Sequence, residues 1–186
     1  MRTRRGGFSL VELMIVVVIL GIISTMVLVS IQAMLPRTRL NSAVRDLAAT
    51  LHEARSDAIS RNAEFQVEYY FEEDAGHPRG YRVITPFSAS GEGGLAIRNE
   101  ERLAREWHTL PEEVSFTSIT LNGEVYETGQ VVVSFDALGG ASDHTISLIQ
   151  APYERGYTIE VLALTGLIRF HDGDFRREYP KESDFN

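Results

Sequence analysis

Gly7-Phe8-Ser9-Leu10-Val11-Glu12 opens an apolar run that continues to Pro36 and decides how the chain is organised. Three arginines precede this run, and no charged residue lies between Leu13 and Pro36. About 20 apolar residues, at a helical rise of roughly 1.5 Å each, cross a hydrocarbon core of about 30 Å. The sequence therefore predicts a membrane-spanning helix whose one charged side chain is Glu12.

Glu12 is an expensive residue in such a segment. Insertion scales give roughly +2.5 to 3.5 kcal/mol for an Asp at the centre of a membrane helix, and less toward its ends. One interpretation places Glu12 close to the lipid headgroups, where the cost is small. The other gives the carboxylate a functional partner, which is the general rule for acidic residues inside membranes.

The residues around Glu12 resemble a known processing signal. A basic leader ends at Gly7, Phe8 follows, and Glu12 is the fifth residue after the glycine. The leader charges come from Arg2, Arg4 and Arg5. This order is similar to the class III signal of type IV prepilins and type II secretion pseudopilins. The resemblance implies cleavage between Gly7 and Phe8 by a prepilin peptidase and methylation of the new Phe8 amine. It also implies that Glu12 sets the register of assembly by facing the N-terminal amine of a neighbouring subunit.

Two other kinds of N-terminal segment fit less well. A cleaved secretory signal has an apolar region of roughly 7 to 15 residues and then a small-x-small site. This run is longer, and Ile31-Gln32-Ala33 places a bulky residue where a small one is needed. A plain signal anchor explains the arginines and the length but gives no reason for Glu12.

The distribution of positive charge predicts the orientation in the membrane. The leader arginines and the initiating amine outweigh Arg37 and Arg39 on the other side, which favours a cytoplasmic N-terminus. Together with the resemblance, this predicts a single-pass protein of the bacterial inner membrane. Its C-terminal domain is then periplasmic and is displayed on an assembled pseudopilus.

The composition of the chain disfavours nucleic acid as a partner and excludes sites that depend on cysteine. The formal net charge is −8, and loss of the three leader arginines would change the side-chain total to −11. Nucleic acid is disfavoured as a partner, because phosphates call for clustered Lys and Arg. The basic residues of the tail, interspersed with five acids, are Arg176, Arg177 and Lys181. The chain has no Cys, so disulfides, thiolate metal sites and thiol nucleophiles are ruled out.

After Pro36 the pattern becomes amphipathic. Apolar residues recur at spacings of three and four, which places them on one face of a helix. They are Leu40, Val44, Leu47, Leu51, Ala54 and Ala58. We therefore predict one long helix from about Ser9 to Arg61, membrane-facing in its first half and packed on a domain in its second.

Short strands separated by Gly and Pro turns follow the helix. The predicted strands cover 64–71, 81–84, 110–121 up to an Asn122-Gly123 turn, 130–135, 144–150, 157–164 and 167–170. The segment 86–94 is predicted as a loop, and 95–108 is ambiguous between strand and short helix. This pattern predicts an α+β fold, in which a long N-terminal membrane-spanning helix packs on an antiparallel β-rich domain.

The predicted division of the chain has five parts. These are a cleaved leader at 1–7, the transmembrane and assembly half of the helix at 8–35, its amphipathic half at 36–62, a β-rich globular domain at 63–171 and a polar tail at 172–186.

Later segments narrow the resemblance. Residues 51–62, 133–139, 157–161 and 164–170 are similar to the H-type minor pseudopilins, the GspH/FimT-like group, which have a pilin-like fold. The resemblance implies a structural subunit at or near the tip of a type II secretion pseudopilus, without enzyme activity. Implied partners are the prepilin peptidase and methyltransferase, other major and minor pseudopilins, the inner membrane and an exported protein. The alternatives are a minor type IV pilin of the FimT/FimU-like kind, for pilus assembly or DNA uptake, and a membrane-tethered binding module.

No residues form a recognised catalytic pattern. The histidines, which show no metal spacing, are His52, His77, His108, His144 and His171. His171-Asp172-Gly173-Asp174 offers oxygen ligands for Ca²⁺ but lacks the further acids of a dedicated loop. We therefore favour a solvated acidic turn and expect no cofactor. The aromatic residues that could form a recognition surface, but that strands more often bury, are Tyr69, Tyr70, Phe71 and Trp107.

Overall fold

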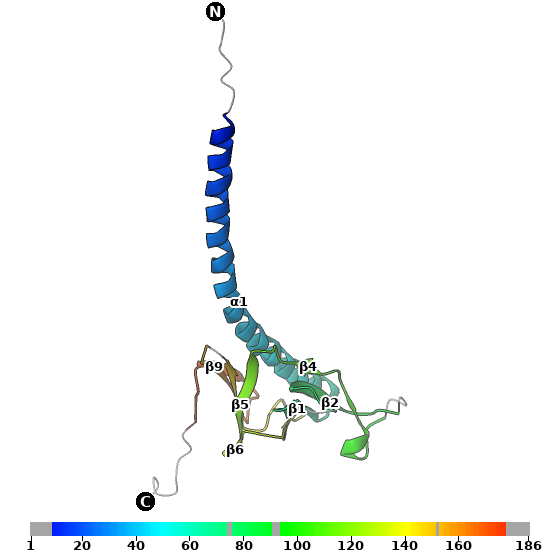
Figure 1. Ribbon diagram of the computed structural model, residues 1–186. Helices are drawn as coiled ribbons and strands as arrows, with labels where there is room; N and C mark the ends of the chain where they lie inside the picture. The colour runs from blue at the N-terminus through cyan, green and yellow to red at the C-terminus, as the bar shows by residue number, and fades with distance from the viewer. Residues whose placement is uncertain (1–8, 74–75, 91–93, 152, 178–186) are drawn as a thin grey trace, which may run out of the picture. The chain divides into compact units, whose positions relative to one another are not determined.

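The computed structural model describes residues 9–73, 76–90, 94–151 and 153–177, and within the helix it leaves the side chains of 25–37 undescribed. The chain divides into two units, residues 1–39 and 40–186. Within the described residues, one α-helix is followed by ten strands and one short 3-10 helix. Figure 1 traces the chain through them. The predicted α+β fold, with an N-terminal helix and antiparallel sheets, is confirmed.

Helix α1 (Leu10–Arg61) has ends that the sequence explains. At its start the Ser9 carbonyl accepts hydrogen bonds from the backbone N–H groups of Glu12 and Leu13, at 3.0 and 3.2 Å. At its end Asn62 adopts a left-handed backbone with φ of 49°. The Ala63 N–H then reaches the Ala58 carbonyl at 3.1 Å. This is the Schellman arrangement that commonly ends helices at Gly or Asn, and it lies where the helical pattern of the sequence stops.

The first part of α1 was predicted to cross a membrane. Among the residues that the structure describes, none of the helices is long and apolar enough for a membrane span. The predicted spanning segment, 8–35, includes residues outside the described part, and its insertion in a membrane stays a prediction.

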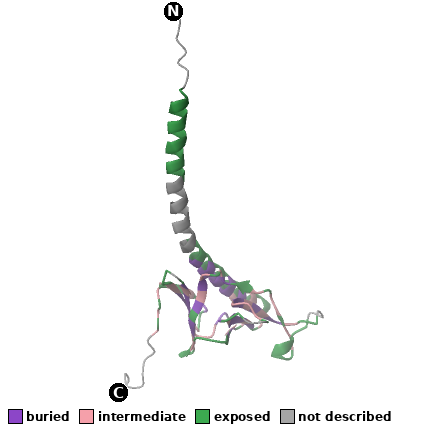
Figure 2. Ribbon diagram, viewed as in Figure 1, coloured by how far each residue is buried: buried purple, intermediate pink, exposed green. Residues whose placement is uncertain are grey.

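The second part of α1 buries one face, as its periodicity predicts. All six residues expected on that face are buried, and Ala43 and Ala48 join them. In Figure 2 this face forms a purple stripe along the helix. The side chains lie in a single core with residues from both sheets, so this half of the helix is an internal element of the second unit.

The first sheet contains β1 (Phe65–Tyr70), β2 (Gly80–Ser88), β3 (Arg102–Ala104), β4 (His108–Thr109) and β7 (Gln130–Phe135). Its strand order is β3-β2-β1-β7, with β4 also pairing with β2, and all pairs are antiparallel. Side chains of β1 alternate, so Phe65, Val67 and Tyr69 enter the core. Strands β1 and β2, which follow each other in the chain, pair antiparallel from Gln66 opposite Ile84 to Tyr70 opposite Gly80.

The second sheet contains β5 (Val114–Leu121), β6 (Glu124–Tyr126), β8 (His144–Gln150), β9 (Arg155–Val161) and β10 (Ile168–Asp172). Its order is β10-β9-β8-β5-β6, again antiparallel throughout. The turn between β5 and β6 is formed by Asn122 and Gly123, with φ of 52° and 88°. Positive φ at both central residues defines the hairpin turn that Asn-Gly favours, as predicted.

Some bounds differ from the sequence prediction: the strand predicted at 157–164 ends at Val161, and the one predicted at 110–121 begins at Val114. The predicted loop at 86–94 is wrong in its first residues, because β2 continues to Ser88. Pro86 is tolerated there since the pairing of β1 with β2 ends at Ile84, so no ladder bond to β1 requires its missing N–H. The ambiguous segment 95–108 contains both alternatives: a 3-10 turn, η1 (Asn99–Glu101), precedes β3 and β4.

Candidate functional site

Glu12 lies in the first turn of α1 and is exposed. The free N–H groups at a helix N-terminus give it a partial positive charge, which favours a carboxylate in that turn. Glu12 is followed by apolar residues, so its charge stands at one end of an uncharged surface. This position suits a group that selects one alignment of packed helices over others.

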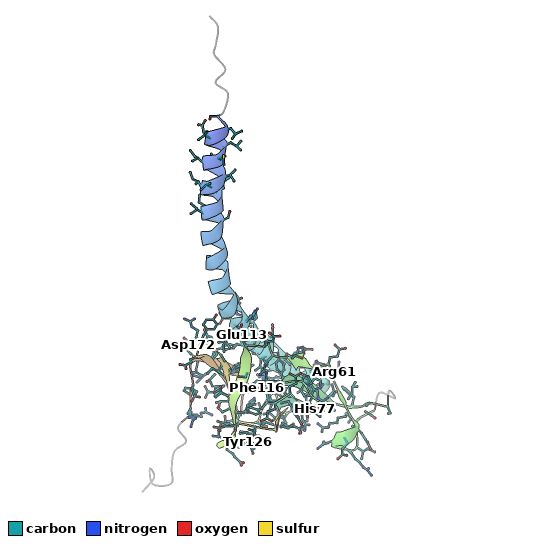
Figure 3. All side chains as sticks on the ribbon, viewed as in Figure 1. Arg61, His77, Glu113, Phe116, Tyr126 and Asp172 are labelled. Atoms are coloured by element: carbon teal, nitrogen blue, oxygen red, sulfur yellow. The ribbon has the colours of Figure 1, made fainter. Side chains whose placement is uncertain are left out.

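The described side chains after Glu12 are exposed on every side of the helix. Residues 9–24 are all exposed, and Figure 3 shows side chains projecting around the whole circumference of this part of α1. The large apolar ones are Leu10, Val11, Leu13, Met14, Ile15, Val16, Val17, Val18, Ile19, Leu20, Ile22 and Ile23. A helix that is apolar all round is normally buried in protein or lipid. This segment of the first unit therefore needs cover that the chain itself does not supply among the described residues.

The predicted processing residues cannot be placed in the structure. Gly7 and Phe8 lie outside the described residues, as do Arg2, Arg4 and Arg5. Their roles in cleavage, methylation and leader charge stay predictions.

The histidines have separate surroundings. His52 is exposed on α1. His77 stacks on Tyr70 with ring centroids 4.6 Å apart, and His108 stacks on Tyr81 at 5.2 Å. These contacts give the rings packing partners and bring no two histidines together.

His144 is the one histidine buried in the core. Its Nδ1 lies 2.6 Å from the Ser142 carbonyl, while Nε2 has no hydrogen-bond partner among the described atoms. Burial lowers the pKa of His144 from 6.5 to about 4, opposed by the hydrogen bond to Ser142 and the charge of Asp143. A neutral imidazole is therefore part of the folded core. No periodic pattern in the sequence marked His144 as buried, beyond its place in a strand.

The segment considered for Ca²⁺, residues 171–174, makes hydrogen bonds and an ion pair with the second sheet. Asp174 accepts a hydrogen bond from the Ser147 hydroxyl at 3.3 Å, and His171 Nε2 lies 3.1 Å from the Glu160 carboxylate. The Gly173 carbonyl accepts from the Thr158 hydroxyl at 2.8 Å. Across the described ranges, no group of three or more His, Asp or Glu side chains could hold a metal ion.

The aromatic residues divide between core and surface. Tyr69 and Phe71 are buried, as favoured for strand residues. Tyr70 and Trp107 are only half-buried, and their rings meet edge to face at 6.1 Å. The Arg82 guanidinium lies 4.4 Å from the centroid of the Trp107 ring. These groups cover the outer face of the first sheet. The sequence pattern alone did not distinguish these surface aromatic residues from the buried ones.

The basic residues of the tail are close to acids. Arg177 contacts Asp143 at 2.8 Å and Glu160 at 3.5 Å, and Arg176 contacts Asp174 at 3.4 Å. Lys181 lies outside the described residues. Strand β10 extends to Asp172, the first residue of the predicted tail, and the next residues are bonded to the second sheet. Arg176 and Arg177 thus take part in local ion pairs.

Polar contacts between α1 and the loops that connect the strands were missed by the sequence analysis. Arg55 donates from Nε to the Gly139 carbonyl at 2.9 Å. Arg105 donates to Glu53 at 2.7 Å and also to Asp57. The partners are separated by 48 to 84 residues in sequence, and no local pattern marks such pairs.

Two stretches of the chain match known families. Residues 2–28 match the prokaryotic N-terminal methylation motif, and residues 43–165 match the family of the type II transport protein GspH. No curated protein matches the chain.

Some solved structures have a similar backbone fold. The minor pseudopilin EpsH from the type 2 secretion system of Vibrio cholerae is 12% identical, with a TM-score of 0.49 over 72% of this chain and 97% of that chain. The type IV minor pilin FimU of Pseudomonas aeruginosa strain PAO1 is 18% identical, with a TM-score of 0.46 over 73% of this chain and 90% of that chain. Likeness at this level says nothing about function.

Proposed function

Because the chain belongs to the GspH family of type II transport proteins, it is a minor pseudopilin of type II secretion, and we propose that it works as a structural subunit near the pseudopilus tip. The observation that carries the proposal is the order of the two matches. A methylation motif at 2–28 precedes the family domain at 43–165. The motif implies processing by a prepilin peptidase and assembly with other pseudopilins. The family is one of structural subunits, so we assign no reaction to the chain.

The exposed apolar part of α1 supports this role. Helices of neighbouring subunits would cover the apolar side chains that follow Glu12, whose exposure to water would cost about 25 cal/mol for each Å². Before assembly, lipid would cover the same surface. We therefore place the chain in the inner membrane with a cytoplasmic N-terminus and a periplasmic domain.

Glu12 would specify the register of this packing. Cleavage after Gly7 makes Phe8 the N-terminal residue, and its amine is a positive charge of the kind that Glu12 requires. An ion pair in a bundle of low polarity contributes little net stability after desolvation, but a misaligned register leaves the carboxylate unpaired at a cost of several kcal/mol. The pair therefore selects an alignment more than it strengthens the fibre.

Intact mass tests the proposed processing. The protein would be purified from membranes of cells with and without a prepilin peptidase. We expect loss of Met1 to Gly7 and addition of one methyl group only when the peptidase is present. A full-length, unmodified mass in both preparations would overturn the proposed processing and leave Glu12 without its partner.

A further inference from the structure

Strand β10 is the outer strand of the second sheet and pairs on one side only. It follows β9 in register, from Ile168 opposite Val161 to Asp172 opposite Tyr157. Among the described residues no strand pairs with its other side. An unpaired strand edge presents a row of N–H and C=O groups on which another strand can add.

Backbone hydrogen bonds just before and just after β10 show which of its groups point outward. The Leu162 N–H donates to the Leu167 carbonyl at 3.0 Å, and the Gly173 N–H donates to the Gly156 carbonyl at 2.9 Å. Both pairs continue the register of β9 with β10. In antiparallel pairs, hydrogen-bonded and non-hydrogen-bonded positions alternate. Arg169 and His171 therefore bond to β9, and the backbone groups of the intervening residues point away from the sheet. These residues are Ile168, Phe170 and Asp172.

The side chains at this edge have two different faces. Phe170 lies opposite Ile159, a core residue, yet 53% of its side chain is exposed. Arg169 lies opposite Glu160 on the other face and is exposed. The edge thus has apolar surface on one face and a guanidinium on the other.

The outer strand of the first sheet is partly closed. In β7 the Ser134 N–H donates to the Ser142 hydroxyl at 3.1 Å, and the Ser142 N–H donates to the Ser134 carbonyl at 2.9 Å. The chain therefore covers this edge with its own loop. No comparable contact covers the outward groups of Ile168, Phe170 and Asp172 among the described residues.

We propose that the open edge of β10 receives an extended segment of a neighbouring pseudopilin, with alternating apolar and acidic residues. Its apolar side chains would pack on Ile168 and Phe170, and a carboxylate would pair with Arg169. Because the occupant is a fibre subunit, this inference rests on the proposed function.

A second copy of the chain fits the edge less well than such a segment. Two copies paired through β10 and centred on Phe170 would place Arg169 opposite His171, where no carboxylate can meet the guanidinium.

Hydrogen exchange tests the edge without any fibre. In the full-length chain in detergent, we expect the N–H groups of Phe170 and Asp172 to exchange at least tenfold faster than those of Arg169 and His171. The peptide acetyl-Val-Glu-Val-Glu-Val-amide should then slow exchange at Phe170 and Asp172, and its Lys-for-Glu counterpart should require at least tenfold higher concentration. Equal protection of all four groups in the free chain, or no response to the peptide, would overturn the inference.

Cross-linking tests the occupant in assembled fibres. The chain has no Cys, so Leu164→Cys, at a fully exposed turn residue, provides a single thiol for cross-linking to a neighbour. In that background Phe170→Pro removes both the aromatic ring and the outward N–H donor, whereas Phe170→Ala removes the ring and keeps the donor. We expect cross-linking to a neighbouring pseudopilin to fall at least tenfold in Phe170→Pro and less than threefold in Phe170→Ala.

The outcomes separate this inference from the proposed function. Unchanged cross-linking in Phe170→Pro, or cross-linking only to a second copy or to an exported protein, would overturn the β10 inference while leaving assembly intact. Failure of the unsubstituted chain to enter fibres would instead overturn the proposed function. The exchange experiment would then still report on the edge itself.

Discussion

The two halves of α1 contain similar apolar residues but use them differently. Residues 9–24 expose their side chains on every side, whereas the half that begins at Leu40 buries one face against two sheets. The difference lies in the arrangement of polar residues around the helix. One half leaves a polar face to water, and the other requires cover from another molecule. The comparison shows that charged residues, one in 9–24 and six in 40–61, distinguish a helix that needs cover all round from one with a solvated face.

The largest effect on stability is expected from matched leucine truncations in the two halves. Leu51→Ala empties part of a fully buried site and should lower the unfolding free energy by about 2–5 kcal/mol. Leu20→Ala, at a residue 57% exposed, should change it by less than about 0.5 kcal/mol. Urea denaturation of the full-length chain in detergent, followed by fluorescence of the single residue Trp107, measures both. Equal losses would show that the exposed half also belongs to the folding unit.

A smaller effect, confined to the buried region, is expected from pH. The pKa of His144 is about 4 in the folded chain, below its ordinary value of 6.5, so the unfolded chain takes up a proton first. The contribution of His144 to stability is complete above pH 6.5 and is lost as pH falls toward 4, by about 3 kcal/mol. Urea denaturation between pH 4 and 7 should show this slope in the natural chain and a flatter one in His144→Phe. The same slope in both would exclude His144 as its origin.

The smallest effect on stability, with the largest effect on assembly, is expected at Glu12. Glu12→Ala should leave the unfolding free energy within about 0.5 kcal/mol, because the side chain is exposed in the isolated chain. It should nevertheless block incorporation into the fibre, measured by cross-linking through an introduced Cys. Ser24→Ala is a matched control, since its hydroxyl bonds only to its own helix at Leu20. Normal cross-linking of Glu12→Ala would show that Glu12 does not set the register.

Periodic features of the fold could be predicted from the sequence. The limits of β7 and β8 agree with the predicted strands, and the helix ends where Asn62 supplies a left-handed residue. Each of these features depends on residues close in sequence, namely alternating apolar side chains or a turn residue. For the same reason the six-residue buried face of α1 was recovered.

Features that depend on distant residues could not be predicted. Strands β3 and β4 are too short to show a period, and they form because β2 offers an edge. The burial of His144 and the bond of Arg55 to Gly139 depend on how the sheets pack. The open edge of β10 likewise follows from strand order, which local pattern does not specify. The proposed processing and assembly residues, Gly7, Phe8 and Glu12, were predicted from a motif. Of these three, the structure describes Glu12.

The contact of Arg55 with two glycine turns has a mechanical consequence. Gly139 follows β7 of the first sheet and Gly166 precedes β10 of the second, with φ of 87° and 58°. A Cβ atom at Gly166 would lie 2.5 Å from the Gly139 carbonyl oxygen and 2.7 Å from the Arg55 side chain, so only glycine permits this approach. A pulling force on this part of α1 would therefore reach both turns through Arg55, in addition to the core side chains that α1 shares with the sheets. We expect the helix and the two sheets to resist detachment together, as a single unit under tension.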